Sequence, residues 1–209
     1  MDAKRRQILD AALAIADERG LDAVSMRSVA ARVGLTPMAL YPYVGSKGAL
    51  LDGIVDRLMA TLPRLPSDVD WRERLLAMAQ GARDLARAHP AAFPLLLARP
   101  SVTPDAARTV DGVYGALLEA GVAPQHVARL ERMISTFVLG FAISEVNGRF
   151  GSTTVNPRTT RMETFPGELD AHRTLAEHLA ETPDWDAEFL ADLEDLTRVI
   201  EARTLSDRD

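Results

Sequence analysis

The chain has 209 residues, 47% of them hydrophobic and 26% charged, which is ordinary for a globular protein and excludes disorder of the whole chain. It has no cysteine, so disulfides, thiolate metal sites and a cysteine nucleophile are excluded. The formal net charge is −6, which alone argues against a nucleic-acid partner, although the distribution of charge matters more than the sum.

Nearly every segment has the apolar spacing that is typical of helices. The pattern that starts at Ile8 predicts a first helix that ends near Gly20. Ser25 is a good N-cap for a short second helix, which Gly34 ends. The sequence shows no convincing strand, and residues 150–155 are only a weak candidate.

Three Thr-Pro pairs each join an N-capping hydroxyl to a proline suited to the first helical position. They predict helices that begin after Thr36, Thr103 and Thr182. Two other segments, 62–70 and 151–170, are rich in residues that favour turns and are expected to be irregular. The helices expected in the second part of the chain are about 71–89, 104–120, 124–150 and 184–203.

The most informative stretch runs from Ser25 to Lys47. Ala30 is small enough to let two short helices approach closely, and Gly34 permits the positive φ of a tight turn. Two short helices around such a turn form a helix-turn-helix, in which the second helix enters the major groove of DNA. The apolar residues at spacings that pack the two helices together are Val29, Val33, Leu35, Leu40 and Tyr43.

The local charge agrees with a DNA-binding role. No acidic residue lies between Asp22 and Asp52, although the chain as a whole is acidic. The basic residues of this stretch are Arg27, Arg32 and Lys47. A patch without negative charge is what a surface that approaches phosphates needs.

The first 60 residues resemble the TetR family of bacterial regulators. The resemblance is carried by a first helix with Ile8, Ala12 and Gly20, followed by the blocks V-A-A-R-V-G-L-T, A-L-Y-x-Y-V and S-K-G-A-L-L-D. The last block, 46–52, is similar to the start of the family's fourth helix. The rest of the chain matches the family only in its length and its helical character, as expected where such bodies diverge with their ligands.

The resemblance implies an all-α fold, with a three-helix helix-turn-helix head over 1–47, a linking helix over 47–61 and a helical-bundle body for ligand binding and dimerisation over 62–209. It also implies a transcriptional repressor that binds double-stranded DNA as a homodimer at a palindromic operator and is released by a small apolar or amphipathic effector. Two alternatives remain open: a DNA-binding regulator without a small-molecule ligand, and a helical carrier or enzyme with a fortuitous N-terminal motif.

The resemblance assigns DNA contacts to residues in and around the second helix of the motif. Lys47 would hold a phosphate at the start of the fourth helix, where free N–H groups and the helix dipole also favour anions. Met38 and Ala39 offer only apolar contact, for example to a thymine methyl group. Two roles are open for Tyr43, packing in the core and contact with a phosphate. The whole assigned set is Arg27, Thr36, Pro37, Met38, Ala39, Tyr41, Tyr43 and Lys47.

Pro42 departs from the expected pattern, because it lies inside the predicted recognition helix. It cannot donate a hydrogen bond to the Met38 carbonyl, and its ring would crowd the preceding turn. The helix should therefore be short or bent there, which limits the transfer of base contacts to residues up to Tyr41. Leu40 is expected to be core, and Arg32 a solvated surface charge.

The body should contain a cavity for an effector, and segment 151–170 is expected to be mobile and to cover its entrance. Each apolar candidate for the lining could instead fill a closed core. The candidates are Phe93, Leu96, Val110, Tyr114, Leu117, Phe137 and Phe141. Glu145 follows an apolar run and needs a partner if it is buried, which could be Arg149 at i+4, a neutral hydrogen bond or the ligand.

Family members usually dimerise by pairing two C-terminal helices from each subunit, which here correspond to about 124–150 and 184–203. The second of these is too apolar to bury only one stripe. A second apolar face suggests a partner chain, although a wide contact with the chain's own body would also account for it. The residues assigned to the interface are Leu190, Leu193, Leu196 and Ile200.

No enzyme motif is found, since the sequence lacks the nucleophile elbow, the P-loop and the dinucleotide-binding glycine pattern. His172 and His178 are too far apart around a helix to form a metal pair, so neither a metal nor a cofactor is expected. The family's tetracycline–magnesium pocket uses a histidine just after the fourth helix, where residues 59–63 of this chain contain none. We therefore expect a different effector.

Neither a membrane span nor a signal peptide is expected. The longest apolar run without a charge, Met133 to Ser144, is shorter than the roughly 20 residues that a spanning helix needs. Basic residues open the chain, but Asp10 and Asp17 interrupt the apolar stretch that a signal peptide would need next. The sequence therefore predicts a cytoplasmic protein.

Overall fold

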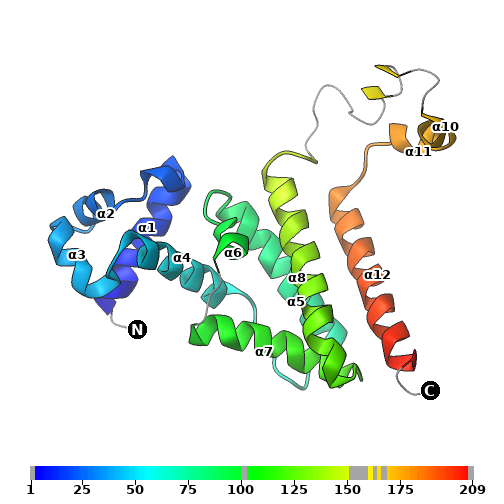
Figure 1. Ribbon diagram of the computed structural model, residues 1–209, viewed down its shortest axis with the longest axis horizontal. Helices are drawn as coiled ribbons and strands as arrows, with labels where there is room; N and C mark the ends of the chain where they lie inside the picture. The colour runs from blue at the N-terminus through cyan, green and yellow to red at the C-terminus, as the bar shows by residue number, and fades with distance from the viewer. Residues whose placement is uncertain (1–2, 100–102, 151–159, 162–163, 166–168, 207–209) are drawn as a thin grey trace.

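Figure 1 shows the computed structural model, in which the N-terminal helices lie to one side of a helical bundle. The structure describes residues 3–99, 103–150, 160–161, 164–165 and 169–206. Within these residues every regular element is a helix and no strand occurs, so the prediction of an all-α fold is confirmed. The weak strand candidate and most of the predicted lid segment lie outside the described residues.

The head consists of α1 (Ala3–Arg19), the 3-10 turn η1 (Leu21–Ala23), α2 (Met26–Arg32) and α3 (Pro37–Val44). Gly20 follows the last residue of α1 with a φ of 82°, in the left-handed region that favours glycine, where the sequence predicts the end of this helix. A fourth helix, α4 (Lys47–Thr61), begins three residues after α3 and leads to the body.

The bundle consists of α5 (Trp71–Ala88), α6 (Leu95–Ala98), α7 (Pro104–Glu119), α8 (Pro124–Val146) and α12 (Trp185–Ser206). Two short helices, α10 (Asp170–Thr174) and α11 (Ala176–Ala180), lie beyond the ends of α8 and α12 and apart from the rest of the bundle (Figure 1). The sequence did not predict these two helices. Each has only five residues, and neither has a buried side chain, so the sequence shows no apolar periodicity there.

Two of the three helix starts that Thr-Pro pairs predict are confirmed. Thr36 and Thr103 cap α3 and α7 through their side-chain oxygens, with proline at the first helical position. The third prediction is wrong, because α12 begins at Trp185 and Asp184 provides the cap. The Asp184 carboxylate accepts two backbone N–H groups of the first turn, at 3.0 and 3.2 Å, and so satisfies the donors that the threonine was expected to satisfy.

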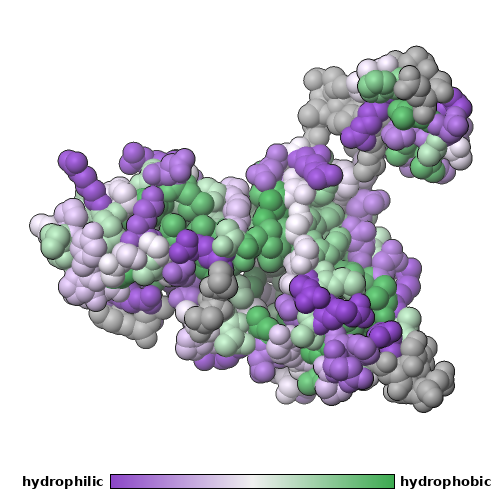
Figure 2. Space-filling view, in the orientation of Figure 1, coloured by the Kyte–Doolittle hydropathy of each residue, from purple (hydrophilic) through white to green (hydrophobic). Residues whose placement is uncertain are grey.

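One apolar core joins the head to the body. It contains buried residues of α1, α2, α3 and α4 together with Leu85 of α5, Ala142 of α8 and Phe93, which is fully buried. Within it α1 and α4 approach so closely that a Cβ at Gly53 would collide with the Leu9 side chain. Figure 2 shows hydrophobic side chains gathered where the head meets the bundle. The helix α4 therefore packs in a core that both parts share.

A second apolar core holds α12 on the bundle. Phe189 and Ile200 of α12 are almost fully buried in it. The ring centroid of Phe189 lies 4.8 Å from that of Phe141 on α8, and Trp185 stacks on Phe150 at 4.3 Å. These aromatic contacts fix the first turns of α12 against the end of α8.

Candidate functional site

The turn between α2 and α3 has the geometry of a helix-turn-helix. Ser25 caps α2 by accepting a hydrogen bond from the Ser28 N–H at 3.1 Å, and the Ser28 hydroxyl accepts from the Ser25 N–H in return. Gly34 turns the chain with a φ of 68°, and Thr36 then caps α3. Three fully buried residues hold the two helices together, namely Val29, Ala30 and Leu40. The burial of Leu40 was predicted from the sequence.

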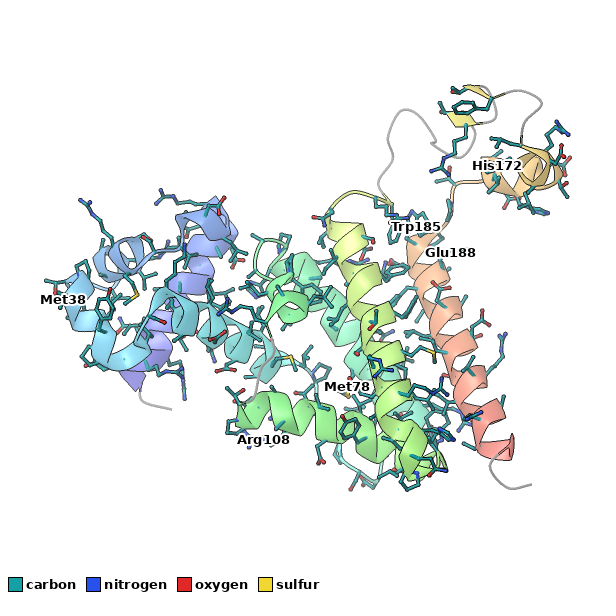
Figure 3. The ribbon with its side chains drawn as sticks, in the orientation of Figure 1. Met38, Met78, Arg108, His172, Trp185 and Glu188 are labelled. Atoms are coloured by element: carbon teal, nitrogen blue, oxygen red, sulfur yellow. The ribbon has the colours of Figure 1, made fainter. Side chains whose placement is uncertain are left out.

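Every residue to which the family resemblance assigns a DNA contact is at least partly accessible. Met38 is 75% exposed and Tyr41 is 45% exposed. Figure 3 labels Met38 at the end of the head that is farthest from the bundle. Arg27, Thr36, Pro37 and Lys47 are also exposed, whereas Ala39 and Tyr43 are half-buried. Their role in binding DNA stays a prediction.

Two basic side chains of this surface are available for phosphates. Arg27 and Lys47 make no ion pair or side-chain hydrogen bond with any other residue that the structure describes. Arg32 is different, because it donates two hydrogen bonds to Glu18 of α1, at 2.6 and 2.5 Å. It is exposed, as predicted for a surface charge, and its contact braces α2 against α1.

The recognition helix α3 is short, as Pro42 predicts. It has eight residues and ends at Val44, after which Gly45 adopts a φ of 70°. Pro42 has no N–H group, so the Met38 carbonyl lacks its usual partner within the helix. The exposed side chains available to a DNA groove are therefore concentrated in the first turns of α3.

A cavity of about 290 Å³ lies in the body next to α4. Side chains of α4, α5, α7 and α8 line it, and Met78 of α5 (Figure 3) is one of them. Of the predicted pocket residues, Leu96 and Val110 are in the lining. The polar residues of the lining are Arg99, Thr109, Glu131 and Ser135.

The other predicted apolar pocket residues do not line this cavity. Phe93 and Leu117 are fully buried in the two apolar cores, and Tyr114 packs half-buried against the second core. Phe137 and Phe141 pack against an aromatic ring of α12 instead. Since α8 has one apolar face toward the cavity and another toward α12, apolar character alone did not separate the two.

Glu145, for which the sequence left Arg149, a neutral hydrogen bond or a ligand open as partner, is held by two arginines of α5 and is not among the residues that line the cavity. Its carboxylate accepts hydrogen bonds from Arg83 Nε at 2.8 Å, Arg83 Nη2 at 2.6 Å and Arg87 Nη2 at 2.8 Å. The hydrogen bonds from Arg83, the larger effect, and from Arg87, together with their charges, lower the pKa of Glu145 to about 2, against the opposing effect of burial. The partners were missed because 62 positions separate Arg83 from Glu145.

The same arginines also hold the start of α12. Arg83 and Arg87 lie 2.8 and 2.9 Å from a carboxylate oxygen of Asp186. The Arg83 side chain is only 6% exposed and its guanidinium lies over the Phe141 ring, 5.3 Å from the centroid. We call Arg83, Arg87, Glu145 and Asp186 the ionic clamp, which joins α5, α8 and α12.

Arg99 connects the cavity to α4, and it was not expected from the sequence. It follows α6 and lines the cavity. Its Nε donates a hydrogen bond to Asp52 Oδ1 at 2.6 Å, and its Nη2 donates to the Gly48 carbonyl at 3.2 Å. Both acceptors lie in the first turns of α4, close along the chain to Lys47. Pairs separated by about 50 positions leave no local signal in a single sequence.

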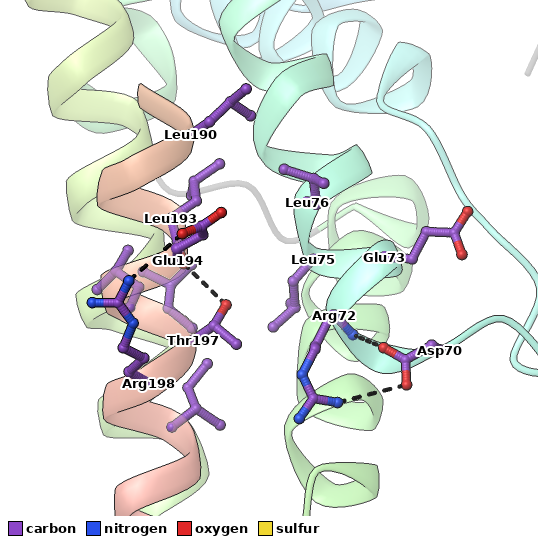
Figure 4. Close-up of a pocket in the computed structure, with 13 residues that line it drawn as sticks. Asp70, Arg72, Glu73, Leu75, Leu76, Leu190, Leu193, Glu194, Thr197 and Arg198 are labelled. Atoms are coloured by element: carbon purple, nitrogen blue, oxygen red, sulfur yellow. Dashed lines mark hydrogen bonds and ion pairs between the residues drawn. The ribbon is translucent and has the colours of Figure 1, made fainter. Parts of the chain in front are cut away.

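An open groove of about 660 Å³ lies between α5 and α12 (Figure 4). Leu75 and Leu76 line it from α5. All four residues assigned to the dimer interface line it from α12, namely Leu190, Leu193, Leu196 and Ile200. Ile200 is only 2% exposed and is a core residue of its own chain, whereas Leu190 is 40% exposed and open to a partner.

No helix in the described part of the chain is both long enough and apolar enough to span a membrane. The described residues also contain no group of three or more His, Asp or Glu side chains that could hold a metal ion. His172 and His178 lie on the separate short helices α10 and α11.

Comparison with known protein families accounts for both parts of the chain. Residues 8–54 match the family described as "Bacterial regulatory proteins, tetR family". Residues 62–166, half of the chain, match "Tetracyclin repressor-like, C-terminal domain". The chain belongs to the TetR family. The resemblance seen in the first 60 residues is thereby confirmed, and it extends into the body.

Two curated relatives of this TetR protein show how much of their length it shares. The HTH-type transcriptional repressor DrrR1 of Streptomyces coeruleorubidus is 35% identical over 67% of this chain and 53% of that protein. The tetracycline repressor protein class A from transposon 1721 of Escherichia coli is 30% identical over 68% of this chain and 66% of that protein. This chain therefore spans about half of the first relative and just under two thirds of the second.

A solved structure shares the whole fold of this TetR protein. The Streptomyces coelicolor TetR family protein ActR, crystallised in complex with actinorhodin, superimposes with a TM-score of 0.82. The match covers 98% of this chain and 99% of that chain at 23% sequence identity. At that identity the likeness establishes the fold and leaves the ligand of this TetR protein to be argued from its own residues.

The ionic clamp should make the stability of this TetR protein depend on pH. The pKa of Glu145 in the folded state, about 2, lies below its ordinary value of 4.5. Its contribution is therefore fully present above the ordinary value and is lost as the pH falls toward the folded-state value. We predict that Glu145→Gln lowers the free energy of unfolding at pH 7 by on the order of 3 kcal/mol, measured by urea denaturation.

The difference between Glu145→Gln and the natural protein should shrink as the pH is lowered from about 5 to about 3. Glu177→Gln is a matched control, because Glu177 is exposed on α11 and should contribute little at any pH. A difference that stays the same from pH 7 to pH 3 would contradict a charged Glu145 in the clamp.

Proposed function

We propose that this TetR protein is a transcriptional repressor that binds double-stranded DNA through its head and is released by a small molecule bound in its body. The observation that carries the proposal is the position of α4. This helix begins with Lys47 on the exposed surface beside the helix-turn-helix, and its Val55 and Met59 line the cavity. A molecule in the cavity would touch the same helix that DNA touches.

The lining of the cavity supports an amphipathic effector. Its walls are mainly apolar, with a few polar groups that could fix the orientation of a ligand, among them Arg99 and Glu131. ActR, which shares the fold, has been crystallised with actinorhodin. A tetracycline–magnesium complex does not fit this proposal, because residues 59–63, at the end of α4 and just after it, contain no histidine.

Release would follow from a shift of population between two arrangements of α4. In the structure Arg99 holds the first turns of α4 through Asp52 and the Gly48 carbonyl. An effector that competes for Arg99, or presses on Val55, would favour an arrangement in which two heads no longer match successive major grooves. The effector must bind that arrangement more tightly, because equal affinity for both would shift nothing.

The two alternative functions have less support. A regulator without a small-molecule ligand gives no role to a mainly apolar cavity beside α4. A carrier or enzyme gives no role to Arg27 and Lys47, which are exposed beside a helix-turn-helix and make no ion pair with any other described residue. We therefore propose a regulator without enzymatic activity, which acts in the cytoplasm because its DNA partner lies there.

We further propose that the repressor is a homodimer on a palindromic operator, since two heads related by a two-fold axis contact two inverted half-sites. The helices proposed for the interface are α8 and α12. Leu190 and Val199 of α12 are 40% and 48% exposed. They are nine positions apart, about two and a half helical turns, so they lie on opposite sides of α12. Both sides of this helix therefore carry an exposed apolar side chain that a partner subunit could cover.

Lys47 should contribute to binding through a phosphate contact. We predict that Lys47→Ala weakens binding to all duplexes about equally and lowers the slope of log affinity against log salt by about one per subunit. Fluorescence anisotropy over a salt series measures both quantities. Arg149→Ala, which removes an exposed cation after the end of α8, should change neither. An altered sequence preference with an unchanged salt slope would contradict the phosphate role.

Charges on the flanks of α12 should separate the proposed dimer. We predict that Leu190→Glu or Val199→Glu yields a monomer at micromolar concentration by light scattering, and that the monomer binds the operator poorly. Leu118→Glu, at a position of α7 that is 50% exposed, should stay dimeric. If all three variants are dimers, α12 does not form the interface. If the natural protein is a monomer that binds one half-site tightly, the dimer proposal itself is wrong.

A further inference from the structure

The recognition helix lacks every side chain that contacts a base pair through two hydrogen bonds. Such contacts come from Arg or Lys on guanine and from Asn or Gln on adenine, while Asp and Glu accept from cytosine. None of these residue types occurs from Val33 to Ser46, a stretch that covers the turn, α3 and the cap of α4. Its polar side chains are four hydroxyl groups, those of Thr36, Tyr41, Tyr43 and Ser46.

Two of these hydroxyl groups are already engaged in the fold. Thr36 accepts the Ala39 N–H at the start of α3, and Ser46 accepts the Ala49 N–H at the start of α4. Hydrogen bonds from the remaining hydroxyls are single and so distinguish bases weakly, because one donor or acceptor fits several of the groups in the major groove. Any discrimination between base pairs that comes from this stretch must therefore rest largely on another kind of contact.

The first turn of α3 offers an apolar surface instead. Met38 is the second residue of the helix and is 75% exposed. Pro37 beside it is exposed and Ala39 is half-buried. In a helix-turn-helix the N-terminal residues of the recognition helix are the ones that contact base edges. Figure 3 shows Met38 at the tip of the head, away from the bundle.

We propose that Met38, flanked by Pro37 and Ala39, recognises thymine through its 5-methyl group, so that each preferred half-site carries thymine where α3 enters the major groove. The inference rests on the proposed DNA-binding function and adds the base that the head prefers. The thymine methyl is the apolar group that a base pair presents in the major groove. Methionine suits it, because an unbranched and polarisable side chain adapts to an apolar partner without a fixed geometry.

Because phosphate contacts do not depend on sequence, the contact between Met38 and thymine sets how strongly the head prefers one base over another. Arg27 and Lys47, which make no ion pair with any other described residue, would supply attraction to phosphates, and that part of the affinity is the same for every sequence. Burial of one methyl group contributes about a fourfold gain in affinity. A two-hydrogen-bond contact would distinguish bases by about 5- to 150-fold. Each base change in the half-site should therefore reduce the affinity by only a small factor, and no single position should dominate the preference.

The test combines a change in the DNA with a change in the protein. A duplex is first selected from a library with a randomised central region by binding to the full-length protein. Each thymine of one selected half-site is then replaced by deoxyuridine, which removes only the methyl group and keeps the base pair. We expect a loss of affinity of about fourfold at one or two adjacent positions.

Met38→Ala should lower the affinity for the thymine duplex and should abolish the further loss at those positions, since the methyl group then has no partner. The fold should tolerate this change, because Met38 is mostly exposed. Leu118→Ala, a matched control at an exposed apolar position of α7, should keep the full deoxyuridine effect.

The outcomes separate this inference from the proposed function. If no deoxyuridine substitution changes the affinity, or if Met38→Ala keeps the full loss, the assignment of thymine recognition to Met38 is overturned, while the selected duplex still supports a DNA-binding repressor. If the library yields no bound duplex, the proposed function fails and the inference fails with it.

Discussion

The packing of α4 is the constraint on which the rest of the structure depends. On the head side, α4 approaches α1 so closely that Gly53 leaves no room for a Cβ beside Leu9. On the body side, Val55 of the same helix lines the cavity. Because protein interiors are close-packed and transmit strain, α4 cannot shift relative to the body without carrying the head with it. A small change in the body can therefore move the head, which is the movement that the proposed function requires.

Two sets of ionic contacts act on this arrangement, and their exposure gives them different roles. The Arg83 and Glu145 side chains of the clamp are 6% and 17% exposed, so removing one of them would leave the other in a poorly solvated site without its main partner. The Arg99 and Asp52 side chains are 31% and 53% exposed, so water and salt can replace that contact at little cost. The clamp fixes the bundle, whereas the Arg99 pair is the contact that an effector would displace under the proposed function.

The head could be predicted from the sequence because local signals determine it. The cap at Ser25, the positive φ at Gly34 and the cap at Thr36 each act within a few residues. Together they fix where two short helices start and stop, which is most of what a helix-turn-helix requires. The shortness of α3 also follows from one residue, Pro42, through its missing N–H.

The body was less predictable because its contacts join distant positions. Phe141 and Val138 are neighbours on α8, yet one packs against α12 and the other lines the cavity, and apolar spacing does not distinguish these faces. The partners of Glu145 and of Arg99 lie on other helices, so no local pattern reveals them. Asp184 rather than Thr182 caps α12, because both are good capping residues and tertiary packing decides where the helix begins.

The central claim is that filling the cavity moves the heads, and one distance measurement tests it. The chain has no cysteine, so Ala31→Cys gives a single spin-label site on the exposed surface of α2 in each subunit. Val110→Trp would fill part of the cavity from α7, and Leu118→Trp is an exposed control on the same helix. We predict that Val110→Trp changes the distance between the labels in the dimer and weakens operator binding about tenfold, while Leu118→Trp changes neither. A folded Val110→Trp dimer with an unchanged distance and unchanged operator affinity would contradict the claim.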